Sequence, residues 1–408
     1  MLRIAIVSDI HAGTSDARAT HVLAGPSALA RGLQPLSDLV HLIGDEGLEA
    51  DYLVVPGDIA NQADAGGLAY GWRKVHEIAE NLGAEMIAVP GNHDVVTHSS
   101  SADPRAMLKK LLPTFPTGDA TIDATFWDKG WAVCESDDHR ILMIDSTCAF
   151  PPFPTWAVVG DADWHDYMRA IDRGSFPEAM ENELDEYIRA ADPKLNFVVV
   201  HHHPQEHQHK SYLQDEYGAM NRGADLLDLL SRHPRAGRWI LIHGHRHIPQ
   251  LVNAITTTSN GPLVLCAASL GAKLWSPVDT IARNQFHIVD ATDEDTSFPG
   301  SVRGSVESYT WGYGDGWHAS ERRGAGLPST SGFGCSDDFR LVSQQILAHM
   351  DDNKLQFIEY AALKGVVPQL PYMLPKDLEF LEGDLEMKGF GFMRDRQNRL
   401  RQVIRSTS

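Results

Sequence analysis

Two histidines in one short segment, His245 and His247, have the types and spacing that most clearly suggest chemistry in this chain. Imidazole nitrogens placed so closely can bind one metal ion or two neighbouring ions. Four other segments supply aspartate, asparagine and histidine side chains that could complete a ligand set. These segments are Asp9-Ile10-His11, Gly57-Asp58-Ile59-Ala60-Asn61, Gly91-Asn92-His93-Asp94 and His201-His202-His203-Pro204.

Each of these four segments follows an apolar, β-branched run that is typical of a buried strand. The runs cover 2–7, 52–55, 86–89 and 197–200. An α/β sheet presents its functional loops at the carboxyl ends of its strands. One Asp-x-His or Gly-Asp pair would be weak support, because such pairs are common in turns. Their joint order along the chain predicts a single metal site.

The number of candidate ligands indicates two ions rather than one. Seven ligands drawn from these five segments would be too many for one ion with an open coordination position. Hydrolytic two-metal sites hold their ions roughly 3.5–4 Å apart, and a bridging carboxylate offsets the repulsion between the cations. Asp58, alone on its loop after Gly57, is the expected bridge. Without a thiolate we expect two divalent ions, manganese or iron, with zinc or nickel as alternatives.

The first 295 residues alternate between strand and helix patterns and then end in hairpins. Helices are expected over 33–46, 67–82, 177–190 and 219–232, and later strands over 250–255, 262–267 and 284–289, with a turn at Asn260-Gly261. This order predicts an α/β fold: a four-layer αββα sandwich of two mixed β-sheets flanked by helices. We expect residues 1–295 to form the catalytic domain.

Residues 296–408 are expected to form a C-terminal α+β extension, acting as a cap or an oligomerisation element. A strand is expected over 303–311, a long Gly-rich loop over 312–334, a helix over 339–350, a strand over 355–360 and a helix from 375. The aromatic residues Tyr309, Trp311, Tyr313 and Trp317 either stack a base as a lid or pack as a small core. The arginines between 394 and 405 are interpreted as a solvated helix face.

Composition limits the class of protein. A formal net charge of −20 over 408 residues argues against non-specific nucleic-acid binding, which usually needs a basic surface. The four cysteines show neither metal-ligand spacing nor a disulfide framework. No signal-peptide or membrane-spanning pattern is visible. We therefore expect a cytoplasmic protein with no membrane partner, and homo-oligomerisation stays open.

The motifs resemble those of the calcineurin-like metallophosphoesterases. That family carries Asp-x-His, Gly-Asp-x-x-(Asp/Asn), Gly-Asn-His-(Asp/Glu), a strand-terminal His before Pro, and Gly-His-x-His, and this chain has all five in that order over about residues 1–295. The resemblance implies one metal on Asp9, His11 and His247, a second on Asn92, His202 and His245, and Asp58 between them. It also implies that His93 faces the phosphoryl oxygens or the leaving group, with Asp94 holding its imidazole.

The histidine run leaves one ambiguity. Successive side chains of an extended segment alternate faces, so one of His201, His202 and His203 points differently from its neighbours. The family's ligand lies two residues before the proline, which selects His202, with His201 or His203 as alternatives. His203, Arg246 and Asn61 are then candidate substrate contacts.

Differences from neighbouring branches narrow the expected reaction. Purple acid phosphatases place a tyrosine three residues after the bridging aspartate, where this chain has Asn61. The pattern looks more like bacterial phosphodiesterases, including those acting on cyclic nucleotides. The resemblance implies hydrolysis of a phosphodiester, a cyclic or other small nucleotide, by a metal-bridging hydroxide. The alternatives are a nuclease, a phosphomonoesterase, or a non-catalytic scaffold of the same fold.

Overall fold

The computed structural model describes the chain except for residues 16–17, 26–29, 210, 212–217, 259–260, 293–301, 321–324, 396–398 and 407–408. The expected Asn260-Gly261 turn therefore lies partly outside the described residues. Within the described residues, no helix combines the length and the apolar character needed to cross a membrane.

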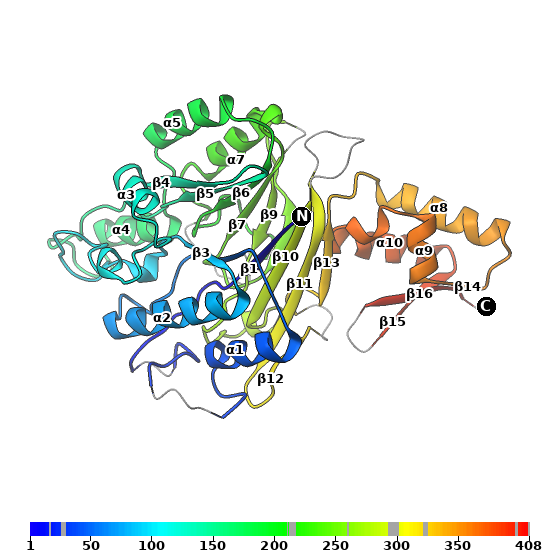
Figure 1. Cartoon of the computed structure of the whole chain (residues 1–408), viewed down its shortest axis with the longest axis horizontal. Helices are drawn as coiled ribbons and strands as arrows, with labels where there is room; N and C mark the ends of the chain where they lie inside the picture. The colour runs from blue at the N-terminus through cyan, green and yellow to red at the C-terminus, as the bar shows by residue number, and fades with distance from the viewer. Residues whose placement is uncertain are drawn as a thin grey trace.

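Two large mixed sheets form the centre of the molecule (Figure 1). The first has the order β12-β11-β10-β1-β2-β3, and β13 also pairs with β11. Its strands are β1 (Leu2–Ile6), β2 (Tyr52–Val55), β3 (Glu85–Ala88), β10 (Gln285–Thr292), β11 (Arg303–Gly312), β12 (Gly316–Ala319) and β13 (Thr330–Phe333). β1, β2 and β3 are parallel, so their carboxyl ends lie at the same edge.

The second sheet has the order β4-β5-β6-β7-β9-β8. Its strands are β4 (Trp131–Glu135), β5 (His139–Ile144), β6 (Leu195–Val199), β7 (Trp239–His243), β8 (Gln250–Asn253) and β9 (Leu263–Cys266). Alternate residues separate its two faces, as a pleated strand requires. Ile141 and Phe197 join the core between the sheets, whereas Leu142 and Val198 join the core under the outer helices.

Helices cover the outer faces of both sheets. Those of the first 295 residues are α1 (Pro35–Glu46), α2 (Ala65–Leu82), α3 (Ala120–Lys129), α4 (Ala162–Arg173), α5 (Glu178–Arg189) and α7 (Gly223–Arg232). The apolar stripes of α1 and α2 belong to the core of the first sheet, and those of α5 and α7 pack on the second. Figure 1 shows these layers from top to bottom. The predicted αββα sandwich is confirmed.

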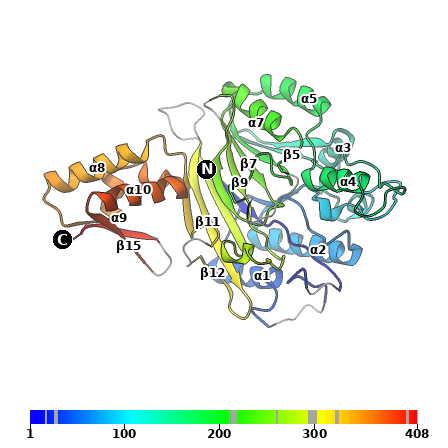
Figure 2. The same ribbon diagram turned by 180° about the vertical axis from the view of Figure 1, so that it is seen from behind.

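A separate unit follows the first sheet. It contains α8 (Phe339–Asp352), β14 (Phe357–Glu359), α9 (Tyr360–Val366), α10 (Pro375–Met387), β15 (Phe390–Arg394) and β16 (Leu400–Arg405). The strands form a small antiparallel sheet, β14-β16-β15, over a core of its own. Seen from behind in Figure 2, this unit lies beyond the β11 edge of the large sheet. The order helix–strand–helix–helix–strand–strand is that of a winged helix.

The expected boundary at residue 295 needs correction. β11 pairs with β10 over eight residues, from Arg303–Thr292 to Thr310–Gln285, and β12 and β13 both pair with β11. Residues 303–333 therefore belong to the first sheet rather than to the extension. The predicted loop over 312–334 contains two strands, and the arginine-rich tail forms strands instead of a helix face.

The aromatic residues of this region pack mostly as a core. The Trp311 indole donates to Asp38 (2.8 Å) and the Trp317 indole to the Pro35 carbonyl (2.8 Å), so both rings are fixed against α1. Tyr309 lies beside Phe286, and Tyr313 is exposed at the β11–β12 turn. Trp311 and Trp317 thus belong to the packing of α1 and cannot form a lid.

Candidate metal centre

The five motif segments meet at the carboxyl ends of five strands. Asp9 and His11 follow β1, Asp58 follows β2, Asn92 follows β3, and the other two segments follow β6 and β7. Main-chain hydrogen bonds continue the pairing of β1 and β2 past the strand ends: His11 N–H donates to the Asp58 carbonyl at 2.9 Å. The loops that carry the functional side chains are therefore fixed to one another by their backbones.

Five of the seven expected ligands have left-handed backbones. Their φ values are 50° at Asp9, 49° at His11, 53° at Asp58, 73° at His245 and 60° at His247. Such a conformation costs a non-glycine residue on the order of 1–3 kcal/mol and persists where surrounding structure enforces it. Its recurrence at these residues marks a site in which backbone strain serves to aim side chains.

One group of donors combines Asp9, His11 and His247. The Nε2 atoms of His11 and His247 lie 3.1 Å apart, and His247 Nε2 lies 3.3 Å from Asp9 Oδ1. The Asp9 carboxylate is held by the Ser8 hydroxyl (2.5 Å) and by the His245 N–H (2.9 Å). Two imidazole nitrogens and a carboxylate oxygen converge here, as a cation site requires.

A second group combines Asn92, His201 and His245. Asn92 Oδ1 lies 3.1 Å from His201 Nε2 and 3.1 Å from His245 Nδ1. The other nitrogen of His201 donates to the Pro56 carbonyl at 2.7 Å. That hydrogen bond keeps a proton on Nδ1, so Nε2 faces the shared space and can offer its lone pair to a metal once its own proton is released.

Asp58 lies between the two groups. Its Oδ2 is 3.7 Å from His11 Nε2 and 3.3 Å from His201 Nε2, while its Oδ1 accepts the His93 N–H at 2.8 Å. A single carboxylate oxygen therefore faces both donor groups. This is the arrangement expected of a bridging ligand, with the second oxygen used to hold the next loop.

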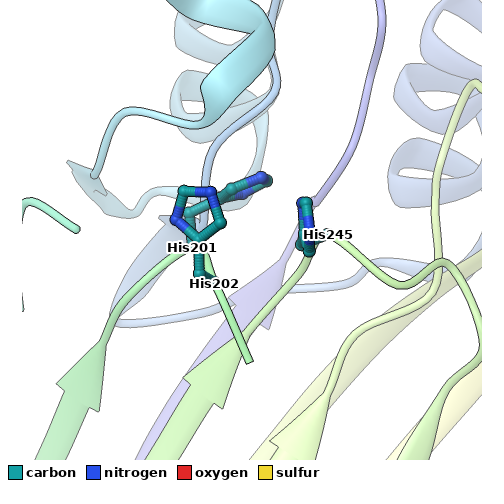
Figure 3. A group of neighbouring side chains, drawn as sticks. All are labelled: His201, His202 and His245. Atoms are coloured by element: carbon teal, nitrogen blue, oxygen red, sulfur yellow. The ribbon is translucent and has the colours of Figure 1, made fainter. Parts of the chain in front are cut away.

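The expected role of His202 needs correction. His202 Nδ1 accepts from the Ser146 hydroxyl at 2.7 Å, and its Nε2 donates to the Ile171 carbonyl at 3.2 Å. Both nitrogens are thus engaged with protein groups, although His201, His202 and His245 lie side by side in Figure 3. The geometry favours His201 for the position that the distance to the proline had given to His202.

The strand pattern contains the signal that would have selected His201. Phe197 and Val199 face the core between the sheets, whereas Val198 and Val200 face the outer helices. Continuing this alternation directs residue 201 toward the space between the sheets, where the other donors lie. The distance from Pro204 selected the wrong histidine because the direction of each side chain is set by the strand register.

The charges of the site suit cations. Burial alone would raise the pKa of Asp58, but the neighbouring imidazoles lower it well below its ordinary value. Burial and the charge of His93 lower the pKa of His11 to about 3, and burial and Arg246 hold the pKa of His245 well below 6.5. Buried carboxylates beside neutral imidazoles are the forms in which these groups bind divalent metals.

His93 and Asp94 do not form the expected pair. Asp94 is fully buried and accepts the N–H groups of Ala60 (2.7 Å) and Gly91 (2.9 Å). It therefore joins the loop after β2 to the loop after β3. The His93 Nδ1 instead accepts the Gln62 N–H at 3.3 Å. Asp94 thus positions the loops, and Gln62 orients the imidazole.

Two of the three expected substrate contacts lie behind the donor groups. The Arg246 guanidinium donates to His203 (3.1 Å) and pairs with Asp172 (3.2 Å), and the His203 ring stacks on His245 at 5.8 Å. Both side chains are buried. They therefore support His245. Asn61 is also buried, with its side chain beside Gly13.

Two glycines allow the loops to approach the carboxylates. A Cβ at Gly91 would overlap Asp58 Oδ1, and a Cβ at Gly244 would overlap the Asp9 carboxylate and Ser8 Oγ. Only a residue without a side chain fits at these positions. The glycines of Gly-Asn-His-Asp and Gly-His-x-His thus serve the close packing of the two aspartates.

Comparison with known families identifies the chain. A family model described as calcineurin-like phosphoesterase matches residues 2–250. The chain belongs to the calcineurin-like phosphoesterase family. It is a phosphohydrolase with a set of candidate metal-binding residues in the expected place. A second family model, described as wHTH-Calcineurin_assc, matches residues 331–386, from β13 of the first sheet to α10 of the winged-helix unit.

One curated relative is a cAMP/cGMP dual specificity phosphodiesterase of Mycobacterium tuberculosis, 28% identical over 131 residues. The match covers 31% of this chain and 36% of that protein, about a third of its length. Among solved structures, a dimetal phosphatase from Danio rerio has a TM-score of 0.47 and 13% identity, over 76% of this chain and 99% of that one.

A purple acid phosphatase from yellow lupin has a TM-score of 0.43 and 14% identity, over 77% of this chain and 52% of that one. Both structural likenesses are too distant to carry a functional argument. The family assignment therefore rests on the match over residues 2–250.

We predict that His201→Gln lowers the metal content of the loaded protein from about two ions per chain to about one, whereas His202→Gln keeps both. The reason is that only His201 directs a free nitrogen into the site. Plasma mass spectrometry of dialysed protein measures the content, and circular dichroism checks the fold. Metal loss in His202→Gln alone would reverse the assignment.

We also predict that metal binding releases about one proton at pH 7.5. Burial lowers the pKa of His201, but the charge of Asp58 outweighs it and raises the pKa to about 9. The metal-free protein therefore holds this proton below about pH 9, and release should vanish as the pH rises through that value. Calorimetric titration in buffers of different ionisation enthalpy measures the release. Buffer-independent heats at pH 7.5 would contradict the prediction.

Proposed function

We propose that the protein hydrolyses a phosphodiester, a cyclic or other small nucleotide, with two divalent cations bound at the site. The observation that carries the proposal is the completeness of the donor set. Asp9, His11 and His247 converge on one side of Asp58, and Asn92, His201 and His245 on the other. We propose manganese or iron as the ions.

The residues fit two cations. The Nε2 atoms of His11 and His247 face each other at 3.1 Å, and the Asp9 and Asp58 carboxylates lie beside them. Burial makes the negative charges of the Asp9 and Asp58 carboxylates costly, and bound cations would offset them. When bound, two cations would supply a nucleophilic hydroxide near neutral pH and bind the non-bridging phosphate oxygens.

His93 is the residue best placed to contact the reacting groups. Its ring lies 4.7 Å from that of His11, edge to face. The Gln62 N–H occupies Nδ1, so the neutral ring carries its proton on Nε2. Burial lowers the pKa of His93, which favours this neutral form. We therefore assign His93 as a hydrogen-bond donor to a phosphoryl or leaving-group oxygen, rather than as a preformed imidazolium.

The relative from Mycobacterium tuberculosis supports a phosphodiester of a small nucleotide as substrate. That protein is a cAMP/cGMP dual specificity phosphodiesterase, and the matched segment is 28% identical to this chain. Because that match spans about a third of the relative, the substrate is a proposal for this chain. Besides the nuclease discussed next, the alternatives are hydrolysis of a phosphomonoester and a non-catalytic role. The complete donor set argues against a non-catalytic role.

A nuclease is the second candidate, because this chain carries a winged helix–turn–helix. Such units often bind DNA through the second helix of the helix–turn–helix. In this chain that helix is α10, which carries Asp377, Glu379, Glu382, Asp384 and Glu386 against one lysine, Lys376. Arg394 and Arg405, on the wing strands, pair with Glu382 and Asp351. An acidic helix repels the phosphate backbone, so the charge disfavours this candidate.

The function is tested by assaying the manganese- and iron-loaded protein with 3′,5′-cyclic AMP, a dinucleotide, single-stranded DNA and a phosphomonoester. We expect turnover of the small diesters, with activity that depends only weakly on salt. A steep loss of DNA cleavage with rising salt would support the nuclease instead. No hydrolysis of any diester by protein that holds both metals would overturn the proposal.

We predict that His93→Ala lowers kcat by about 10²–10⁴-fold while the metal content stays unchanged, because a positioned donor is lost but no ligand is. Steady-state kinetics on 3′,5′-cyclic AMP and metal analysis of the same sample measure the two effects. Turnover equal to that of the wild type would remove His93 from the reaction.

A further inference from the structure

An exposed indole lies directly beside one of the proposed metal ligands. Trp275 is 44% exposed, and its ring centre lies 6.0 Å from that of His247 at an interplanar angle of 64°. The Nε2 atom of the same histidine lies 3.3 Å from Asp9 and 3.1 Å from His11. Trp275 is therefore separated from the donor group by a single side chain.

The backbone around Trp275 is fixed to the metal centre. The preceding segment follows β9, and its Gly271 N–H donates to the Asp9 carbonyl at 3.2 Å. Lys273 N–H donates to the Ala19 carbonyl (2.8 Å), and the Trp275 carbonyl accepts from Asp279 N–H (3.0 Å). The chain is thus anchored two residues before Trp275 and at the carbonyl of Trp275 itself, although the ring is not buried.

The indole of Trp275 lacks the hydrogen bond that holds several other indoles of the chain in place. Trp72, Trp311 and Trp317 each donate Nε1–H to a protein oxygen at 2.8–2.9 Å. Within the part of the chain that the structure describes, Trp275 donates to no protein acceptor. A half-exposed aromatic ring with an unused donor is a surface that a planar ligand can cover.

We propose that Trp275 is the stacking platform for the base of a nucleotide substrate. This inference rests on the proposed function and names the part of the substrate that the site selects. A base is joined to its phosphate through one ribose, and Trp275 is one side chain away from the donor group. Stacking of a base on an aromatic ring is sequence-tolerant, because every base has a π face.

The test compares ligands with and without a base. Isothermal titration of the manganese-loaded protein with 5′-AMP and with ribose 5-phosphate separates the contribution of the base from that of the phosphate. We expect the wild type to bind 5′-AMP more tightly, and Trp275→Ala to weaken 5′-AMP binding by about 5- to 150-fold while leaving ribose 5-phosphate unchanged. Trp275→Phe should keep most of the preference.

A matched control is Trp156→Ala, which removes another exposed indole (69% exposed), located before α4. This variant should bind 5′-AMP as the wild type does. Equal affinity of the wild type for 5′-AMP and ribose 5-phosphate would overturn the inference, as would an equal effect of Trp275→Ala on both ligands or a Trp156→Ala loss as large as that of Trp275→Ala.

Kinetics give a second measurement. With 3′,5′-cyclic AMP, Trp275→Ala should raise KM by a similar factor, whereas KM for the abasic ribose 3′,5′-cyclic phosphate should not change. If the loaded wild type hydrolyses no diester, the proposed function fails, but the binding difference between 5′-AMP and ribose 5-phosphate still decides the role of Trp275.

Discussion

The buried carboxylate of Asp58 is the constraint on which the rest of the site depends. One of its oxygens faces the imidazoles of both donor groups, and the other accepts the N–H of His93. A buried carboxylate is costly unless it is paired and hydrogen-bonded, so every loop around it supplies a partner or a donor. The neighbouring loop requires a glycine at position 91, because a side chain on Gly91 would occupy the space of the Asp58 oxygen. The geometry of the site therefore follows from satisfying one buried charge.

The backbone meets this constraint at some energetic cost. Left-handed φ values at Asp9, His11 and Asp58 turn the chain sharply after β1 and β2, so that side chains from two different loops reach a common space. The main-chain hydrogen bonds from the first loop to the Gly57 and Asp58 carbonyls hold these turns in place. On its other side, Ser269 Oγ donates to the Asp9 carbonyl at 2.7 Å and links the end of the second sheet to the first. The same contacts therefore hold the two sheets together and orient the ligand side chains.

Much of the fold and of the site could be predicted from the sequence, because strand ends and ligand types are local features. Each run before a motif is a strand, and Asp9, Asp58, Asn92, His245 and His247 lie where their motifs placed them. What the motifs could not decide was the direction of individual side chains. The distance to the proline selected His202, and the family resemblance paired Asp94 with His93, but strand register and backbone N–H groups determine where these side chains point. The sequence also did not reveal that the first sheet continues beyond residue 295. No motif marks β11, which pairs with β10.

The winged-helix unit shows why a fold name does not carry function. Its topology is that of modules that insert a helix into DNA, yet α10 presents five acidic residues and one lysine. Leu374 and Lys376, at the start of α10, line a cavity of about 810 Å³ together with Pro204 and Leu251 of the catalytic domain. The unit also contacts the first sheet of the catalytic domain: the Cys335 N–H donates to the Tyr372 carbonyl at 2.9 Å, and the guanidinium of Arg303 in β11 lies 5.1 Å from the centre of the Tyr372 ring. The acidic charge of α10 weighs against phosphate-backbone binding through this helix.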